Sequence, residues 1–398
     1  MEELLNPLAF KQKFCHITEQ IFEQLDIKSI SNCREVSKSW RKCIDDKNQA
    51  WIHIVKIPEI LDDGDTYIHL VARTGQLEMF QKMLKKERAK NPDNKYKETP
   101  FILACQYGHF KIANMYFENS SEFKINPNAR VQKPVKRGVD SEEHSLDDNW
   151  TAFHHACCKG NSKVVQLLIQ KSLDNNIDLD AKDSYGMTPF HWACRRGQSE
   201  VTKMLIQHST KYGIDLNSKD NSGRTAFHFA CEQNYCEKSK LGLVEMLLNY
   251  SATYNIDLSD KIKNDFYSYP LLAKSNFLKL ISVSMTGSTA FHVACCSGQS
   301  EIVQLLIKRS TDHKIDLNAK NSSGWTGFHL ACGFGHTEIV EMLIDNSEAC
   351  KLDLSAKEYE NGRTGIQLAE YLENTSLVNL IKGKLTNENQ LKCPSVVT

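Results

Sequence analysis

The sequence predicts an all-α fold in which a solenoid of stacked helix pairs follows a small three-helix module. The first observation behind this prediction is a phrase of Thr, a small residue or Pro, Phe, His, any residue, Ala and Cys, which recurs along most of the chain. Successive copies are mostly 33 to 38 residues apart, a period typical of repeat proteins. Second, each clear copy is followed by an apolar stretch with helical periodicity. Third, a stretch near the N-terminus lacks the phrase but is rich in aromatic and aliphatic residues.

The first predicted unit is a module over residues 14–58, preceded by an extension over residues 1–13. Its first helix, around Thr18–Leu25, starts at a Thr, which is a good helix cap. A second helix is expected around Ser29–Asp45 and a third from about Asn48. Because about 45 residues form only a marginal core, the module is expected to gain stability from a partner. The apolar stripe of the second helix consists of Ile30, Cys33, Val36, Trp40 and Ile44.

The second predicted unit is a repeat array over residues 60–385, in which the phrase occurs in eight copies. Most copies have a Gly two residues before the Thr, where a turn with positive φ is expected, and another Gly nine residues after it, where the first helix should end. A second helix follows. Each pair of helices has more apolar surface than it can bury alone, so neighbouring pairs must stack. The copies begin at Thr66, Thr99, Thr151, Thr188, Thr225, Thr289, Thr326 and Thr364.

The copy TPFHWAC at Thr188, with Gly197 and the helix Val201–Ile206 after it, resembles an ankyrin repeat. The resemblance covers about residues 60–385 and implies an ankyrin-repeat solenoid, in which β-turn loops join the helix pairs. Most copies are 37 residues long instead of the family's length of about 33. The extra residues precede segments such as Ile214–Asn217 and should lengthen the loop after the second helix.

Two insertions interrupt the period of the array. The first, at about residues 121–148, joins a basic patch to an acidic one, with Pro and Gly residues that oppose regular structure. It is interpreted as a solvated loop or, alternatively, as a localisation signal or modification site. The second, at about residues 260–285, is apolar and aromatic, so it either packs back on the array or contacts a partner. The weak copy at Thr364 is interpreted as a capping repeat, and residues 386–398 as a flexible tail.

The N-terminal module resembles an F-box, in which an Ile-Phe-x-x-Leu helix leads to Cys-x-x-Val-x-x-x-Trp and a later Trp. This resemblance implies binding to a Skp-type adaptor. The family's leading Leu-Pro has no counterpart, since Lys13-Phe14 or Phe14-Cys15 stands in its place. The alternative interpretation is a helical cap that only seals the first repeat. The adaptor-binding residues implied by the resemblance are Ile17, Ile21, Phe22, Leu25, Ile30, Val36, Trp40 and Trp51.

Composition excludes several classes of function. Lys plus Arg equal Asp plus Glu at 49 each, so no overall basic field would collect nucleic acid or an anionic membrane. The longest apolar stretches fall far short of the roughly 18 residues that a membrane span needs. The N-terminus carries acidic residues where a secretory signal has a basic leader, so a cytoplasmic or nuclear location is expected. The 14 Cys residues are accordingly expected to be reduced thiols.

The His and Cys residues of the phrase also receive structural interpretations. In the clear copies the His falls three residues after the Thr, where it can tie the turn to nearby backbone or to the Thr hydroxyl. The Cys falls six residues after the Thr, where a small apolar side chain can pack between helices. No C-x-x-C or H-x-x-x-H pairing, Gly-rich phosphate loop, G-x-S-x-G elbow or kinase signature accompanies them. The sequence therefore predicts no catalytic residue, no metal and no cofactor.

A partner is expected to contact the concave side of the array. In stacked repeats the residues that flank the turn Gly and those that end the first helix project there. Large aromatic side chains and Arg at such positions dominate interface energetics. The predicted partner-binding residues are Trp150, Tyr185, Met187, Arg195, Arg196, Arg224, Glu232, Trp325 and Phe334.

The two resemblances together imply a substrate-recognition subunit of an SCF-type cullin-RING E3 ubiquitin ligase. The F-box-like module would bind the Skp-type adaptor and through it a cullin, and the repeats would bind a protein substrate. Associated subunits would perform ubiquitin transfer, so the chain itself is not expected to be an enzyme. The alternative is an ankyrin-repeat scaffold or protein-interaction module without ligase association, which the missing Leu-Pro favours.

Overall fold

The computed structural model describes residues 65–84, 91–123, 125–132, 149–232, 240–263 and 285–391. Within these ranges every regular element is a helix, which agrees with the predicted all-α solenoid. The N-terminal module predicted over residues 14–58 lies outside the described residues, together with its extension and most of the apolar second insertion.

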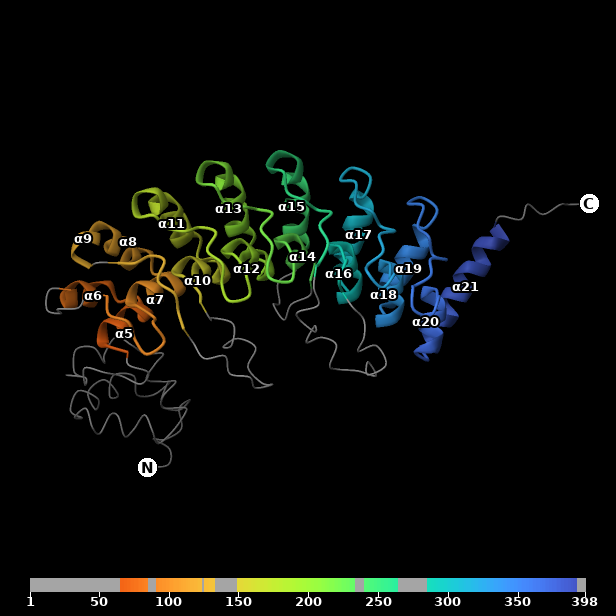
Figure 1. Cartoon of the computed structure of the whole chain (residues 1–398), viewed down its shortest axis with the longest axis horizontal. Coiled ribbons are helices and arrows are strands. Elements are labelled where there is room, and N and C mark those ends of the chain that lie inside the picture. Colours follow the sequence, from red (N-terminus) through yellow and green to blue (C-terminus); the bar gives the residue numbers. More distant parts are fainter. Residues whose placement is uncertain are drawn as a thin grey trace, which may run out of the picture.

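The described helices form two rows along a curved stack (Figure 1). In each repeat an inner helix packs against the outer helix that follows it, and each row continues by contacts between neighbouring repeats. A short helix, α9 (Ser120–Phe123), follows α8. The inner row consists of α5 (Tyr67–Thr74), α7 (Pro100–Gln106), α10 (Ala152–Lys159), α12 (Pro189–Arg195), α14 (Ala226–Cys231), α16 (Ala290–Ser297), α18 (Gly327–Phe334) and α20 (Gly365–Tyr371). The outer row consists of α6 (Leu77–Leu84), α8 (Phe110–Glu118), α11 (Ser162–Asn175), α13 (Ser199–Tyr212), α15 (Leu241–Tyr254), α17 (Ser300–Arg309), α19 (Thr337–Asp345) and α21 (Thr375–Leu391).

A tight turn precedes each inner helix, as the Gly spacing predicts. Gly186 has φ +75°, and Asn149, which replaces Gly in the copy at Thr151, has φ +67°. These left-handed conformations suit Gly and Asn better than other residues. The second Gly directly follows the inner helix in four copies, at Gly75, Gly160, Gly298 and Gly335. Gly160, for example, has φ +77°, and its N–H donates back to the Ala156 carbonyl.

The repeated Thr caps each inner helix, and the repeated His ties one repeat to the next. In α10 the Nδ1 atom of His154 accepts a hydrogen bond from the Thr151 N–H (3.2 Å) and lies 2.9 Å from the Thr151 hydroxyl. Its Nε2 atom faces the carbonyl of Met187 in the next turn at 3.1 Å, so this nitrogen carries the proton. Nε2 atoms are within 3.2 Å of a carbonyl in the following turn at His69, His154, His191, His292 and His329.

One hydrophobic core runs through the stack, from Ile68 in α5 to Ile381 in α21. The repeated Cys lies inside this core, as predicted. Burial raises the pKa of the thiols, to about 12 for Cys194 and Cys231. These thiols therefore stay protonated at neutral pH and serve as small apolar side chains between inner helices.

The first insertion is shorter than predicted. Residues 125–132, expected within a loop that starts at residue 121, continue the repeat: Val131 is buried, and its N–H donates to the Trp150 carbonyl at 2.9 Å. The reason is that Ile125–Ala129 takes the place that the Ile-Asp-Leu-Asn type segments occupy in other repeats, which Pro127 disguises. Residue 124 and residues 133–148 of the insertion lie outside the described residues.

The predicted tail also begins too early. Helix α21 continues to Leu391, six residues past the predicted end of the array at residue 385. Leu377, Val378 and Ile381 are buried against α19 and α20. Between Thr375 and Pro394 the sequence contains no Pro that would end the helix.

Candidate protein-interaction surface

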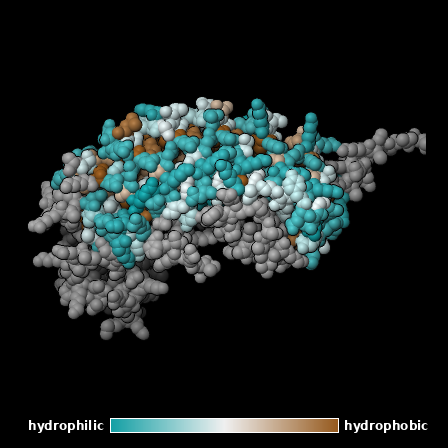
Figure 2. All heavy atoms as spheres, in the orientation of Figure 1, coloured by the Kyte–Doolittle hydropathy of each residue, from teal (hydrophilic) through white to brown (hydrophobic). Residues whose placement is uncertain are grey.

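One side of the stack is lined by inner helices and turns. On this side, aromatic and cationic residues gather in three central repeats, those that begin at Thr151, Thr188 and Thr225. The face of the array seen in Figure 2 is mostly hydrophilic, with hydrophobic residues in scattered spots. The central inner helices α10, α12 and α14 lie next to one another, so their ends and preceding turns form one surface. This surface is the candidate site.

An aromatic cluster separate from the main core lies under this surface. It consists of Trp150, Cys158, Met187, Trp192 and Phe229, with Tyr185 packed at its edge. The indole rings of Trp150 and Trp192 are 4.5 Å apart between centroids and inclined by 59°. Such tilted ring pairs are favourable beyond the area that they bury. The cluster therefore forms a rigid base across three repeats.

Asp183 fixes the two indoles of the aromatic cluster. Its Oδ2 atom accepts hydrogen bonds from Trp192 Nε1 (2.8 Å) and Trp150 Nε1 (3.2 Å). Its Oδ1 atom accepts from the backbone N–H groups of Tyr185 and Met187, which shapes the turn. Burial raises the pKa of Asp183 although all four donors favour its ionised form. One carboxylate thus joins the turn to the aromatic cluster.

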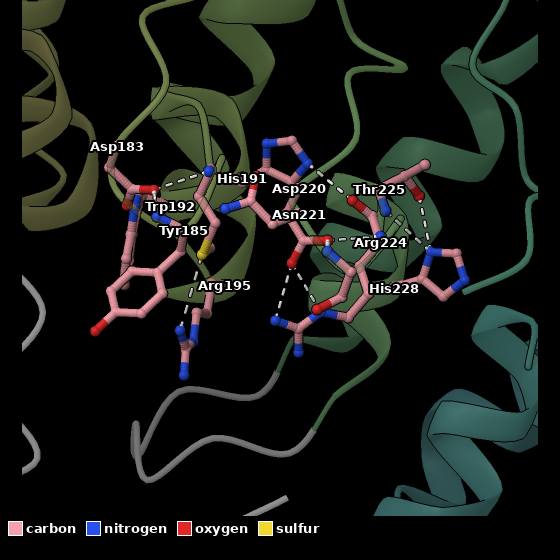
Figure 3. A network of polar contacts seen from close by, with 12 residues as sticks. Asp183, Tyr185, His191, Trp192, Arg195, Asp220, Asn221, Arg224, Thr225 and His228 are labelled. Atoms are coloured by element: carbon pink, nitrogen blue, oxygen red, sulfur yellow. Dashed lines mark hydrogen bonds and ion pairs between the residues drawn. The ribbon is translucent and has the colours of Figure 1, made fainter. Parts of the chain in front are cut away.

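Two arginines lie against the aromatic cluster. The Arg224 guanidinium carbon is 4.3 Å from the Phe229 ring centroid, and that of Arg195 is 5.1 Å from Trp192 and 5.7 Å from Phe229. These are cation–π distances. Arg224 also forms an ion pair with Asp220 at 2.9 Å. In Figure 3 the guanidinium groups of Arg195 and Arg224 point to the same side of the network.

A buried lysine supports the end of α14. Lys240 Nζ donates to the carbonyl oxygens of Phe229 (2.7 Å) and Glu232 (2.9 Å). Burial lowers the pKa of Lys240 to about 8, while the nearby Glu232 carboxylate acts in the opposite direction. Burial also lowers the pKa of Arg195, and the like charges of Arg224 and Arg196 act in the same direction. Lys240 and Arg195 thus place two cationic groups near the Glu232 carboxylate.

The structure divides the nine predicted partner-binding residues by exposure. Those that retain partial exposure are Tyr185, Arg195, Arg196 and Phe334. Those that are buried are Trp150, Met187, Arg224, Glu232 and Trp325. For the buried residues the prediction of direct contact needs correction, because their side chains are covered by neighbouring parts of the chain. Trp150 and Met187, at 2% and 1% exposure, support the surface from below. The role of the exposed residues stays a prediction.

Sequence reasoning missed three residues that build the site: Asp183, Trp192 and Phe229. Trp192 and Phe229 occupy the variable position of the phrase, where the copies at Thr289 and Thr326 have Val293 and Leu330. The aromatic residues at this position, in place of aliphatic ones, could have indicated the site from the sequence. A second signal was an Asp or Asn five residues before the Thr, whose Oδ1 atom accepts from the same two turn N–H groups in each case. These residues are Asn94, Asp183, Asp220 and Asn321.

The predicted adaptor-binding residues lie outside the described residues. They are Ile17, Ile21, Phe22, Leu25, Ile30, Val36, Trp40 and Trp51. Their assignment therefore rests on the sequence pattern.

Comparisons with known proteins agree with both resemblances. A family model described as ankyrin repeats in three copies matches residues 47–131, 130–220, 172–262, 212–357 and 291–389. A model described as F-box-like matches residues 16–56. Among solved structures, the crystal structure of the human ASB11 ankyrin repeat domain is 18% identical with a TM-score of 0.47, and the match covers 67% of this chain and 92% of that chain. No curated protein sequence gives a significant match. Across the described ranges, none of the helices has both the length and the apolar character that crossing a membrane requires.

Proposed function

The chain belongs to the ankyrin-repeat family, and we propose that it acts as the substrate-recognition subunit of an SCF-type cullin-RING E3 ubiquitin ligase. The observation that carries this proposal is the presence of an F-box-like module at residues 16–56 directly before the array in the same chain. The module would hold a Skp-type adaptor and through it a cullin. The array would hold a protein substrate.

The chemistry of the array supports a binding role. The repeated His residues use their ring nitrogens in hydrogen bonds that cap helices and link repeats, as at His154, His191 and His292. Burial raises the pKa of the repeated Cys thiols, as at Cys194, so they are poor nucleophiles. The chain would therefore contribute to ubiquitin transfer by bringing the substrate close to the enzymes that the cullin carries.

The direct test is co-expression of the full chain with the Skp adaptor of the same organism, followed by size-exclusion chromatography. The wild-type chain is expected to co-elute with the adaptor, and Trp40→Ala and Phe22→Asp are expected to abolish co-elution because they remove apolar side chains of the module. Tyr371→Ala is the matched control, since Tyr371 is an exposed aromatic residue at the far end of the array.

Two outcomes would count against the ligase role. If the wild-type chain does not bind the adaptor, the chain is better explained as an ankyrin-repeat scaffold. If Trp40→Ala binds as well as Tyr371→Ala does, the assignment of the module's helix stripe is wrong. A folded array in each variant, monitored by far-ultraviolet circular dichroism, shows that a loss of binding is local.

A further inference from the structure

We infer that the central inner-helix ends, from Lys159 to Arg196, bind an acidic segment of a protein partner. This inference names the chemical class of the substrate, and it rests on the proposed function insofar as the partner is taken to be that substrate. The binding surface is defined by Lys159, Tyr185, Arg195 and Arg196 and is called the arginine surface below.

The first argument is the distribution of charge along the inner row. The positions that end the inner helices carry three cationic residues in the central repeats, Lys159, Arg195 and Arg196, and one acidic residue, the buried Glu232. The corresponding positions in the next two repeats are uncharged, namely Cys296, Ser297, Gly333 and Phe334. The whole chain has no net charge, so this local difference is not a general basic character. A ligand that reads the array by charge would therefore be drawn to the central repeats.

The second argument is the balance of charge at the arginine surface itself. Among the described residues at this surface and directly beneath it, five cationic side chains accompany three carboxylates, which leaves a surplus of positive charge. Two of the carboxylates already have several donors, because Asp183 binds two indoles and Asp220 pairs with Arg224. The cations at the surface are Lys159, Arg195 and Arg196, the buried cations beneath it are Arg224 and Lys240, and the buried carboxylates are Asp183, Asp220 and Glu232.

The third argument is that the aromatic cluster positions the cations. Arg195 lies over the Trp192 and Phe229 rings, and its Nη1 atom approaches the Met187 sulfur at 4.0 Å. A ring face attracts a cation, and a guanidinium group can bind a carboxylate through two N–H groups. A guanidinium held in this way loses less conformational entropy on binding. The surface is therefore prepared for carboxylates.

Size and composition favour a protein segment over nucleic acid. Nucleic acid binding draws on a long track of basic residues, whereas the cations of the arginine surface, Lys159, Arg195 and Arg196, come from two neighbouring repeats. The partly exposed Tyr185 at the edge of the aromatic cluster offers an apolar ring beside the cations. The occupant that fits is a peptide with several Asp or Glu residues and a neighbouring apolar side chain.

The test uses the full chain and a short fluorescein-labelled peptide in which glutamates flank one phenylalanine, with fluorescence anisotropy as the readout. A peptide with glutamine in place of glutamate is the control ligand. The wild-type chain is expected to bind the glutamate peptide at least about tenfold more tightly than the glutamine peptide and to lose affinity as salt is raised. Equal binding of the two peptides would overturn the inference.

Three variants locate the site. Arg196→Gln and Lys159→Gln are each expected to weaken binding of the glutamate peptide by about threefold to tenfold. Lys203→Gln makes the same change in charge on the exposed face of the outer helix α13 and should leave affinity unchanged. Lys159 is exposed, so its variant keeps the fold and the test remains decisive even if Arg196→Gln disturbs it. Wild-type affinity in Lys159→Gln and in folded Arg196→Gln would overturn the inference.

Two other occupants of the arginine surface would give different binding results. If a single-stranded oligonucleotide binds the arginine surface more tightly than the glutamate peptide, the inference is wrong. It is equally wrong if the peptide binds only after the chain's own acidic residues at 140–148 are changed to amides. Adaptor co-elution, measured on the same variants, separates the two proposals. If the adaptor does not co-elute but the glutamate peptide binds, only the ligase role is refuted. If the adaptor co-elutes but the glutamate peptide does not bind, only the acidic-peptide inference is refuted.

Discussion

Mild acid should destabilise the array because its repeated imidazoles are buried in the neutral form. The perturbation is a change from about pH 7 to about pH 5.5, a range in which an unfolded His with a pKa of 6.5 takes up a proton. Burial lowers the pKa of His154 to about 3 and those of His191, His228 and His292 to about 4. These folded imidazoles stay neutral over that range.

The sign and size of the effect follow from proton binding. Between about pH 6.5 and pH 4 the unfolded chain binds more protons than the folded chain, so the free energy of unfolding falls as the pH falls and levels off below about pH 4. The change from about pH 7 to about pH 5.5 costs about 1.3 kcal/mol for each imidazole, or about 5 kcal/mol for the four together. Asp180 offsets part of this loss, since burial raises its pKa to about 6.

The assay is urea unfolding followed by far-ultraviolet circular dichroism at the two pH values, for the wild type and for His154→Gln. Glutamine is the appropriate replacement because Gln367 occupies this position in the last repeat, where its Oε1 atom accepts from the Thr364 N–H at 2.9 Å. The variant should be less stable at neutral pH by about 1 to 3 kcal/mol, since it loses the imidazole's bond to the next turn. Its loss of stability on acidification should be smaller than that of the wild type by about 1.3 kcal/mol.

An unchanged pH dependence in His154→Gln would refute this reasoning, because it would mean that the buried imidazole does not link folding to protons. Wild-type stability that does not fall between the two pH values would refute it for the whole set.

Two further predictions concern the turns and the aromatic cluster. Gly213→Asn should change the free energy of unfolding by less than about 1 kcal/mol, because a Cβ there meets no atom within 4 Å and Asn176 already has the same left-handed conformation after α11. Gly186→Ala should instead cost about 1 to 3 kcal/mol in the same urea assay, because its Cβ would lie 2.8 Å from the Asn221 backbone nitrogen. Asp183→Ala should cost about 3 kcal/mol and shift the tryptophan emission, because two buried indole N–H groups lose their acceptor; unchanged emission would contradict the role of Asp183.

The repeated part of the fold could be predicted because each repeated residue performs one local task. A Thr before an inner helix, such as Thr188, satisfies backbone N–H groups at its start, and a Gly such as Gly186 allows the turn before it. These tasks depend only on neighbours in sequence. The bridge from His191 to the Arg224 carbonyl crosses 33 residues, yet the fixed offset of the His still indicated a link to nearby backbone.

The candidate site could be predicted only in part, because exposure depends on contacts between repeats. Trp150 stands beside a turn and was expected to face a partner, but Trp192 of the next repeat covers it and Asp183 binds both indoles. No offset within one repeat encodes that contact. The loop after α9 was misjudged for a related reason, since Val131 pairs with Trp150 across an insertion that hides their proximity in sequence.

Within a single helix pair, repeated positions stabilise the stack and variable positions are expected to bind the partner. Stability and binding can therefore be changed by separate substitutions. His191 lies inside the stack and links two repeats, whereas Arg196, just after the same inner helix, is partly exposed on the arginine surface. A change at His191 should therefore lower the free energy of unfolding, while Arg196→Gln should lower affinity for the glutamate peptide with little effect on unfolding. If both changes moved the two quantities in parallel, binding would depend on the order of the stack as a whole. Independent effects would assign recognition to the variable positions that distinguish the three central repeats.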